Sequence, residues 1–220
     1  MEKSCMKIGD GETLLMIGDS ITDADRVRPV GNRSFGGLGN GYVSYVDALL
    51  GAASPEKKIQ TLNTGISGNT VRDLKGRWRE DVLDLKPDWL SIMIGINDVW
   101  RQFDSHQNKS SHVHPEEFER TLTELVESTV PHLKGLILMT PYYIELDASD
   151  PMRVMMDQYG SIVKHIAAEN GAVLVDTQAA FNLMMESLNP ASIAADKVHP
   201  NCLGHIALAR AFLKAVEFEW

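Results

Sequence analysis

The chain has 220 residues, a length that fits one domain with a substantial core, and no linker, repeat or low-complexity tract marks a boundary, so we expect a single domain over residues 1–220. Its 30 acidic and 21 basic residues give a net charge of −9, which argues against a nucleic-acid or anionic-membrane partner. Two cysteines are too few for a disulfide framework, and no apolar run approaches the ~20 residues of a membrane span.

Short apolar runs alternate with amphipathic segments along the chain, and this pattern predicts alternating strands and helices. Prolines support the boundaries, since Pro87 ends one helix and Pro115 and Pro151 lie in the first turns of two others. In chain order we expect a strand over 13–17, a helix over 41–50, a strand over 58–63, a helix over 70–85, a strand over 89–94, a helix over 115–130, a strand over 135–139, a helix over 151–170, a strand over 172–176, and helices over 177–188 and 203–216. Strands separated by helices indicate an α/β fold in which a five-stranded parallel sheet is covered by helices on both faces.

Three polar or small residues come shortly after the ends of predicted strands. Ser20 follows the first strand, Gly68 the second and Asn97 the third. Open parallel sheets build their sites beyond the carboxyl ends of their strands. We therefore expect Ser20, Gly68 and Asn97 to meet at one edge of the sheet.

Ser20, His199 and Asp196 have the residue types of a catalytic triad. A serine hydroxyl is a poor nucleophile at neutral pH, so a base within hydrogen-bond distance must take its proton. His199 suits this role because imidazole titrates near neutrality, and Asp196 can orient the ring. The two residues are three apart, a spacing that brings side chains to the same side of a helical turn. Taken singly, Ser20 and Asp196 are as readily explained as helix or turn caps, and His199 as a surface histidine.

The other residues of the set can stabilise a tetrahedral intermediate. Attack on an ester carbonyl places negative charge on its oxygen, and each fixed donor aimed at that oxygen contributes about 3 kcal/mol. The candidate donors are the backbone N–H groups of Ser20 and Gly68 and the side-chain amide of Asn97. Together with the triad they predict an ester-cleaving serine enzyme.

The four segments that carry these residues resemble the SGNH hydrolases, a branch of the GDSL esterase and lipase superfamily. The segments read Gly-Asp-Ser-Ile-Thr at 18–22, Asn-Thr-Gly-Ile-Ser-Gly at 63–68, Gly-Ile-Asn-Asp at 95–98 and Asp-Lys-Val-His at 196–199. The resemblance implies a three-layer, flavodoxin-like fold and a Ser-His-Asp mechanism that needs no metal or cofactor. The first segment has isoleucine where the family has leucine, a swap of similar volume.

Longer stretches at 65–74, 92–102 and 176–181 resemble bacterial acetylxylan esterases of that superfamily. This resemblance implies removal of O-acetyl groups from xylan or acetylated xylo-oligosaccharides. Two alternatives remain open: a lipid or thioester acylhydrolase on the same scaffold, and a catalytically silent carbohydrate-binding protein. Specificity differs widely among proteins that share a fold, so the substrate follows less directly than the reaction.

Asp19, Trp100 and Tyr142 are candidate substrate-binding residues. Asp19 also suits the turn before Ser20, and the two aromatic rings either stack on a sugar or pack in the core. The segment from His106 to His114 is expected to be a solvated loop, because its histidines lack the partner spacing of a metal site. The N-terminus has no signal-peptide core, which favours a cytoplasmic location, and the resemblance suggests a homo-oligomer.

Overall fold

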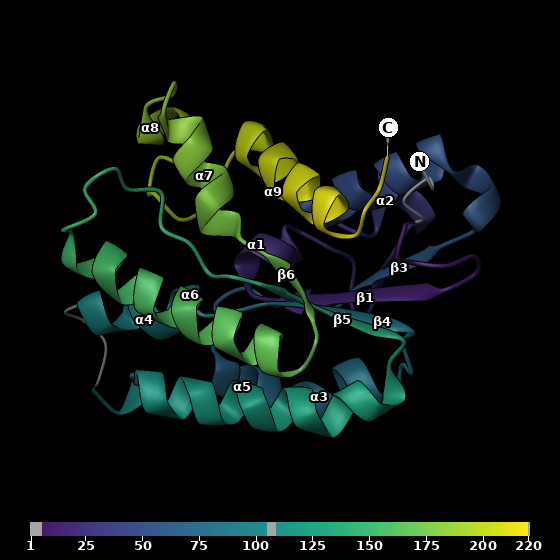
Figure 1. Cartoon of the computed structure of the whole chain (residues 1–220), viewed down its shortest axis with the longest axis horizontal. Helices are drawn as coiled ribbons and strands as arrows, with labels where there is room; N and C mark the ends of the chain where they lie inside the picture. Colours follow the sequence, from purple (N-terminus) through teal and green to yellow (C-terminus); the bar gives the residue numbers. More distant parts are fainter. Residues whose placement is uncertain (1–5, 105–108, 220) are drawn as a thin grey trace.

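The central sheet of the computed structural model, which describes residues 6–104 and 109–219, has its strands in the order β2-β3-β1-β4-β5-β6 (Figure 1). Neighbouring strands are parallel except at one edge, where β2 runs antiparallel to β3. The strands are β1 (Thr13–Gly18), β2 (Gly31–Asn32), β3 (Gln60–Asn63), β4 (Trp89–Met93), β5 (Gly135–Met139) and β6 (Val173–Val175). The five predicted strands are confirmed. The sequence missed β2, because a two-residue strand has no periodicity to detect.

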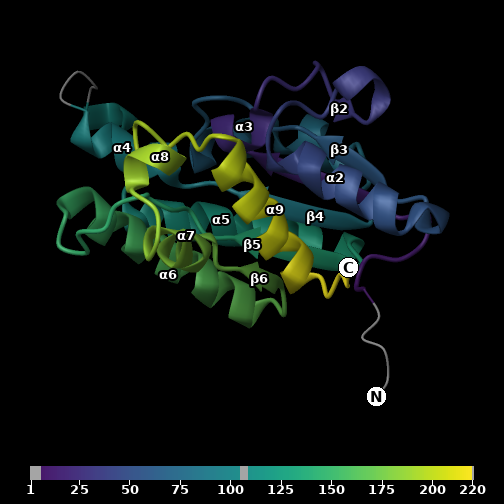
Figure 2. The same ribbon diagram turned by 90° about the horizontal axis from the view of Figure 1, so that it is seen from above.

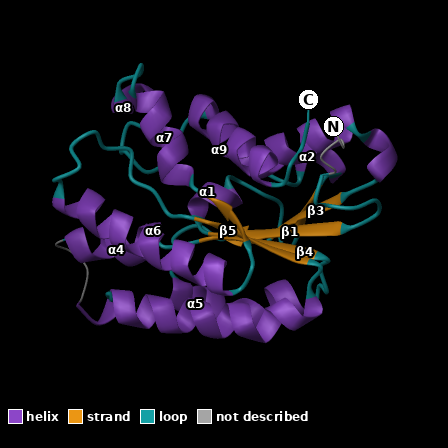
Figure 3. Ribbon diagram, viewed as in Figure 1, coloured by secondary structure: helices purple, strands orange, loops and turns teal. Residues whose placement is uncertain are grey.

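The helices cover both faces of this sheet, as predicted (Figures 1 and 3). On one face α9 packs against α2 and α7, and on the other α5 packs against α3 and α6. Figure 2 shows α9 lying across the strands of its face. The helices are α1 (Ser20–Asp23), α2 (Tyr42–Ala53), α3 (Val71–Trp78), α4 (Ile96–Phe103), α5 (Pro115–Thr129), α6 (Pro151–Glu169), α7 (Thr177–Met185), α8 (Pro190–Ile193) and α9 (Cys202–Ala215).

The direction in which the chain adds parallel strands to the sheet reverses at β1. From β1 the chain crosses to β3 on one side and then to β4 on the other, which gives the flavodoxin-like order β3-β1-β4-β5-β6. Where successive crossovers leave a strand in opposite directions, the loops at the carboxyl ends separate and leave room for a ligand. The loops after β1, β3 and β4 carry Ser20, Gly68 and Asn97.

Local signals in the sequence explain most helix starts. Asp150 caps α6 by accepting hydrogen bonds from two backbone N–H groups, with Pro151 as the first helical residue. Thr70 and Asp73 form a capping box at the start of α3. The helix predicted over 70–85 is α-helical only at its start. Residues Arg79–Leu83 form a π-helical turn.

Three short helices, α1, α4 and α8, were not predicted. No helix was expected between residues 94 and 115, whereas α4 begins at Ile96 directly after Gly95. Gly95 has a φ of 128° and no side chain to cap the helix, so the usual start signal is missing. Elements of four to eight residues also show too little periodicity for recognition by pattern.

Candidate active site

Ser20, His199 and Asp196 form a continuous chain of hydrogen bonds. The Ser20 Oγ lies 2.9 Å from Nε2 of His199, and Nδ1 of the same ring lies 2.6 Å from Oδ2 of Asp196. These contacts fit the tautomer that carries its proton on Nδ1, in which Nε2 accepts the hydroxyl proton of Ser20. The structure therefore brings together the three residues expected as nucleophile, base and orienting carboxylate.

Asp196 and His199 lie in an irregular turn after α8, not on the helical turn that their spacing suggested. Oδ1 of Asp196 accepts hydrogen bonds from the backbone N–H groups of Val198 and His199, at 3.0 and 2.8 Å. Lys197 adopts a φ of 63°, which closes the turn. One carboxylate thus shapes the loop with one oxygen and holds the imidazole with the other.

The carboxyl group of Asp196 is kept ionised by these contacts. Burial on its own would raise its pKa, but the hydrogen bonds from the His199 ring and from the two backbone N–H groups outweigh burial and lower the pKa of Asp196. A carboxylate beside the ring stabilises the imidazolium that forms when His199 takes a proton.

The candidate oxyanion donors Gly68 and Asn97 lie in the loop after β3 and in the first turn of α4. The Nδ2 of Asn97 donates one hydrogen bond to the Asn69 carbonyl, beside Gly68, at 2.9 Å, which leaves its second hydrogen free. Gly68 has a φ of 80°, a conformation that glycine adopts without strain. In the part of the chain that the structure describes, the N–H groups of Ser20 and Gly68 donate to no protein acceptor. They are available to a ligand.

Buried arginines hold the loop that carries Gly68. Arg26 donates from Nε to the Gly65 carbonyl at 2.7 Å, and it is only 5 % exposed. Arg77 donates to the carbonyls of Thr64 and Gly18 and forms an ion pair with Asp81. The sequence did not reveal these arginines, because their contacts with the Gly65, Thr64 and Gly18 carbonyls join residues that are 39, 13 and 59 positions apart.

Asp19, expected as a possible substrate-binding residue, is enclosed by the protein. Its side chain is 1 % exposed and caps α1 by accepting a hydrogen bond from the Ile21 N–H at 3.0 Å. Burial raises the pKa of Asp19 to about 7, although the Ile21 hydrogen bond and the nearby His199 ring act in the opposite direction. A carboxyl group that solvent does not reach has no surface for a sugar, so we correct this expectation. Asp19 shapes the turn that presents Ser20.

The two candidate aromatic residues differ in position. Trp100 is half-buried, and its ring centroid lies 5.9 Å from that of His199, at the rim of the triad. Tyr142 is 1 % exposed, packs on Phe181 and donates a hydrogen bond from its hydroxyl to the Val198 carbonyl at 3.1 Å. The structure corrects the expectation for Tyr142. Its buried side chain supports the turn that carries His199 and does not face a substrate.

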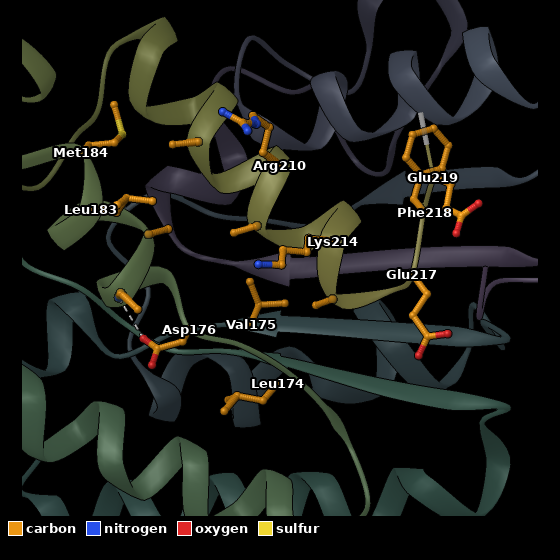
Figure 4. A pocket seen from close by; sticks show the side chains of 15 residues that line it. Leu174, Val175, Asp176, Leu183, Met184, Arg210, Lys214, Glu217, Phe218 and Glu219 are labelled. Atoms are coloured by element: carbon orange, nitrogen blue, oxygen red, sulfur yellow. Dashed lines mark hydrogen bonds between the residues drawn. The ribbon is translucent and has the colours of Figure 1, made fainter. Parts of the chain in front are cut away.

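A groove also lies away from the triad. A groove of about 860 Å³ runs between β6, α7 and α9, and no triad residue lines it (Figure 4). Leu174, Leu183 and Lys214 are among the side chains that border it. This groove is therefore separate from the triad.

The described residues hold no group of three or more histidine, cysteine or carboxylate side chains that could bind a metal ion. His106 lies outside the described residues, and the rings of His112 and His114 are 6.2 Å apart in an edge-to-face arrangement. In the same part of the chain, no helix has both the length and the apolar character needed to cross a membrane.

Comparison with known proteins identifies a family and several similar structures. The model of the GDSL-like lipase/acylhydrolase family matches residues 16–207. An acetylxylan esterase from Geobacillus stearothermophilus is 61% identical over 215 residues, which are 98% of each chain. A crystal structure of Axe2, an acetylxylan esterase from the same organism, has a TM-score of 0.96 at 61% identity and covers 98% of both chains.

An α/β hydrolase from the metagenome of Lake Arreo, Spain, has a TM-score of 0.95 at 48% identity, over 97% of this chain and 99% of its own. Variants of Axe2 described as catalytic mutants carry alanine in place of a serine, of a histidine, and of an aspartate three residues before that histidine. The residue types and the spacing of the last two match His199 and Asp196.

Proposed function

The chain belongs to the GDSL-like lipase/acylhydrolase family and is a carboxylic-ester hydrolase, and from this premise we propose that it removes O-acetyl groups from acetylated xylan or xylo-oligosaccharides through a Ser20–His199–Asp196 mechanism. The observation that carries the proposal is the hydrogen-bonded chain from Ser20 through His199 to Asp196, at 2.9 and 2.6 Å. The acetyl-sugar substrate is supported by 61% identity to an acetylxylan esterase over nearly the whole chain.

In the first half of the reaction, Ser20 Oγ attacks the acetyl carbonyl carbon while Nε2 of His199 takes the hydroxyl proton. The carbonyl oxygen becomes an oxyanion facing the N–H groups of Ser20 and Gly68 and the amide of Asn97. The ester bond to the sugar then breaks, and His199 returns its proton to the sugar oxygen. An acetyl-serine and a free sugar hydroxyl result.

In the second half, water attacks the acetyl-serine, and His199 again takes a proton, this time from the water. Collapse of the second tetrahedral intermediate releases acetate and restores the Ser20 hydroxyl. The lowered pKa of Asp196 keeps its charge beside the imidazolium in both halves of the reaction. No step requires a metal or cofactor.

Trp100 supports a sugar as the alcohol part of the ester. Its half-buried ring lies beside the ring of His199, the residue that protonates the leaving alcohol in the proposed reaction. A flat aromatic face can pack against the C–H face of a pyranose. We assign Trp100 to the binding of the sugar next to the acetyl group.

The test is acetate release from acetylated xylo-oligosaccharides by the wild type and by the variants S20A and D196N. S20A is expected to lose about 10⁶-fold in kcat, and D196N about 10⁴-fold through the wrong histidine tautomer. S161A, which changes an exposed serine on α6, serves as the matched control and should behave as wild type. Full activity of a folded S20A would disprove the covalent mechanism.

A series of p-nitrophenyl esters of increasing chain length separates the remaining alternatives. Activity that is highest on the acetyl ester and falls with chain length is expected. Activity that rises with chain length would favour a lipid acylhydrolase, and inactivity on every ester would favour a carbohydrate-binding protein.

We further propose a cytoplasmic location and a homo-oligomeric state, both carried by the sequence and by the family resemblance. Cell fractionation and light scattering coupled to size-exclusion chromatography test them. Recovery in the culture medium of intact cells, or a monomer mass of 24.4 kDa, would reject the respective proposal.

A further inference from the structure

Arg101 lies one helical turn after Asn97 on α4 and donates a hydrogen bond from Nη2 to the Gly68 carbonyl. Two other side chains of α4 reach the same loop. The Asn97 amide donates to the Asn69 carbonyl at 2.9 Å, and Oδ1 of Asp98 accepts from the Val71 N–H at 3.0 Å. One helix therefore fixes the whole segment that follows the candidate oxyanion donor.

The contact with Arg101 fixes the Gly68–Asn69 peptide group, which directly follows the Ser67–Gly68 peptide group that carries the Gly68 N–H. On the other side of Gly68, Oδ2 of Asp23 accepts hydrogen bonds from both the N–H and the hydroxyl of Ser67, each at 2.9 Å. Glycine has the widest backbone freedom of all residues, and Gly68 lies at a φ of 80°. Without a donor on the Gly68 carbonyl, the Gly68–Asn69 peptide could rotate, and the backbone that sets the direction of the Gly68 N–H would no longer be held from this side.

The guanidinium of Arg101 is placed differently from those of the other arginines near this loop. Arg28 pairs with Asp23 at 2.6 Å and Arg77 with Asp81 at 2.5 Å. Among the residues that the structure describes, no carboxylate forms an ion pair with Arg101. A Cβ atom built on Gly68 would lie 3.8 Å from its Nη2. A positive charge without an ion-pair partner among the described residues thus lies beside Gly68, the candidate oxyanion donor.

We propose that Arg101 is a positioning residue of the oxyanion hole. It holds the backbone at Gly68 through the Gly68 carbonyl, and its positive charge beside this loop favours the oxyanion. This role rests on the proposed function, because only a reaction through a tetrahedral oxyanion requires it. The role differs from substrate binding, in which Arg101 would contact the sugar directly.

The variants R101Q and R101K test the proposal on p-nitrophenyl acetate and on acetylated xylo-oligosaccharides. Loss of an oxyanion donor itself lowers kcat about 10²–10³-fold, and loss of the group that orients the donor is expected to lower kcat about 10-fold or more. KM should stay within twofold, because the interaction belongs to the transition state. R101K, which keeps the charge and one donor, should recover part of the loss.

R33Q is the matched control. Arg33 also donates to a backbone carbonyl, that of Ile59 at 3.3 Å, and pairs with Asp47, but it belongs to no loop of the site. R33Q is expected to keep the wild-type kcat. The rate at which an organophosphonate labels Ser20 gives a second readout, since the labelled serine carries a tetrahedral phosphoryl oxygen in the oxyanion hole. R101Q should slow this labelling by a factor similar to its loss in kcat.

Three results would overturn the positioning role: a kcat of R101Q within twofold of wild type, a higher KM at unchanged kcat, or an equal loss in R101Q and R101K together with a lowered Tm. A wild type that hydrolyses p-nitrophenyl acetate but not the acetylated sugar would overturn only the proposed substrate, and the nitrophenyl ester would still decide the role of Arg101. A wild type inactive on both esters would overturn both.

Discussion

The pKa values of two carboxyl groups, those of Asp19 and Asp98, are shifted mainly by burial. Asp19 and Asp98 are both enclosed, and burial raises the pKa of each to about 7. The two negative charges also repel each other, since the charge of Asp19 contributes to raising the pKa of Asp98. Oδ2 of Asp98 is buried without a hydrogen-bond partner, which makes the ionised form costly. Both carboxyl groups therefore keep their protons in an appreciable fraction of the molecules near neutral pH.

Asp98 makes a pH-dependent contribution to stability that D98N is expected to remove. Between pH ~4 and ~7 the folded state keeps the proton of Asp98, whereas the unfolded chain loses it near pH 3.8. This group therefore lowers the free energy of unfolding as pH rises, by up to about 1.4 kcal/mol per pH unit. Asparagine does not ionise, so D98N should gain stability relative to wild type across that range.

Urea unfolding of wild type and D98N at pH 4, 5.5 and 7 measures the difference, with D10N, a change at an exposed aspartate, as the control. An equal pH dependence in wild type and D98N would show that Asp98 is ionised in the folded protein.

At the scale of elements, a hydrogen bond joins helix α9 to the start of helix α2. His205 on α9 packs against Gly41 and accepts the Tyr42 N–H at 3.2 Å, so it caps the start of α2 in place of a side chain from α2 itself. Burial, and to a lesser extent the charge of His199, lower the pKa of His205 to about 4. The contact requires a neutral ring, because a protonated Nδ1 cannot accept a hydrogen bond.

The contact between α9 and α2 is expected to weaken in acid. Below the unfolded pKa near 6.5 the unfolded chain takes up a proton that folded His205 does not take up until about pH 4. Stability from this group is therefore complete above pH ~6.5 and is lost as pH falls towards 4, by up to about 1.4 kcal/mol per pH unit. H205Q should show a shallower fall in Tm between pH 6.5 and 4.5 than wild type. H132Q, at an exposed histidine, is the control, and parallel curves for H205Q and wild type would contradict the prediction.

At the scale of the whole molecule, all the strands from β1 to β6 belong to one sheet, and this sheet forms a single core with the helices on both faces. The N-terminal segment joins the last helix, since the Lys7 N–H donates to the Val216 carbonyl at 3.0 Å and Ile8 is fully buried. Ser20 and His199 are 179 positions apart and meet only when this core is complete.

We expect the chain to unfold as one cooperative unit. Trp78 and Trp89 are buried in the core, so their fluorescence reports tertiary packing, whereas far-ultraviolet circular dichroism reports the helices. In urea the two signals should change with the same midpoint. Separate midpoints would indicate two independently folding parts and would reject the single domain over residues 1–220.

The sequence by itself determined the family, the order of the main strands and helices, and the identity of the candidate triad. These follow from local information: apolar runs that end at glycine predict buried strands, and short polar segments after those strands carry the chemistry. The sequence could not reveal the burial of Asp19 and Tyr142 or the start of α4, because each depends on what other segments pack nearby.

Only the tertiary structure decided how the Gly68 loop is held. The contacts of Arg26 with Gly65 and of Arg101 with Gly68 join residues 39 and 33 positions apart. A single backbone carbonyl has no sequence signature, so no pattern marks it as the partner of a particular arginine. Local motifs thus identify the residues that carry the chemistry. The orientation of the candidate oxyanion donors depends on long-range hydrogen bonds that exist only in the folded protein.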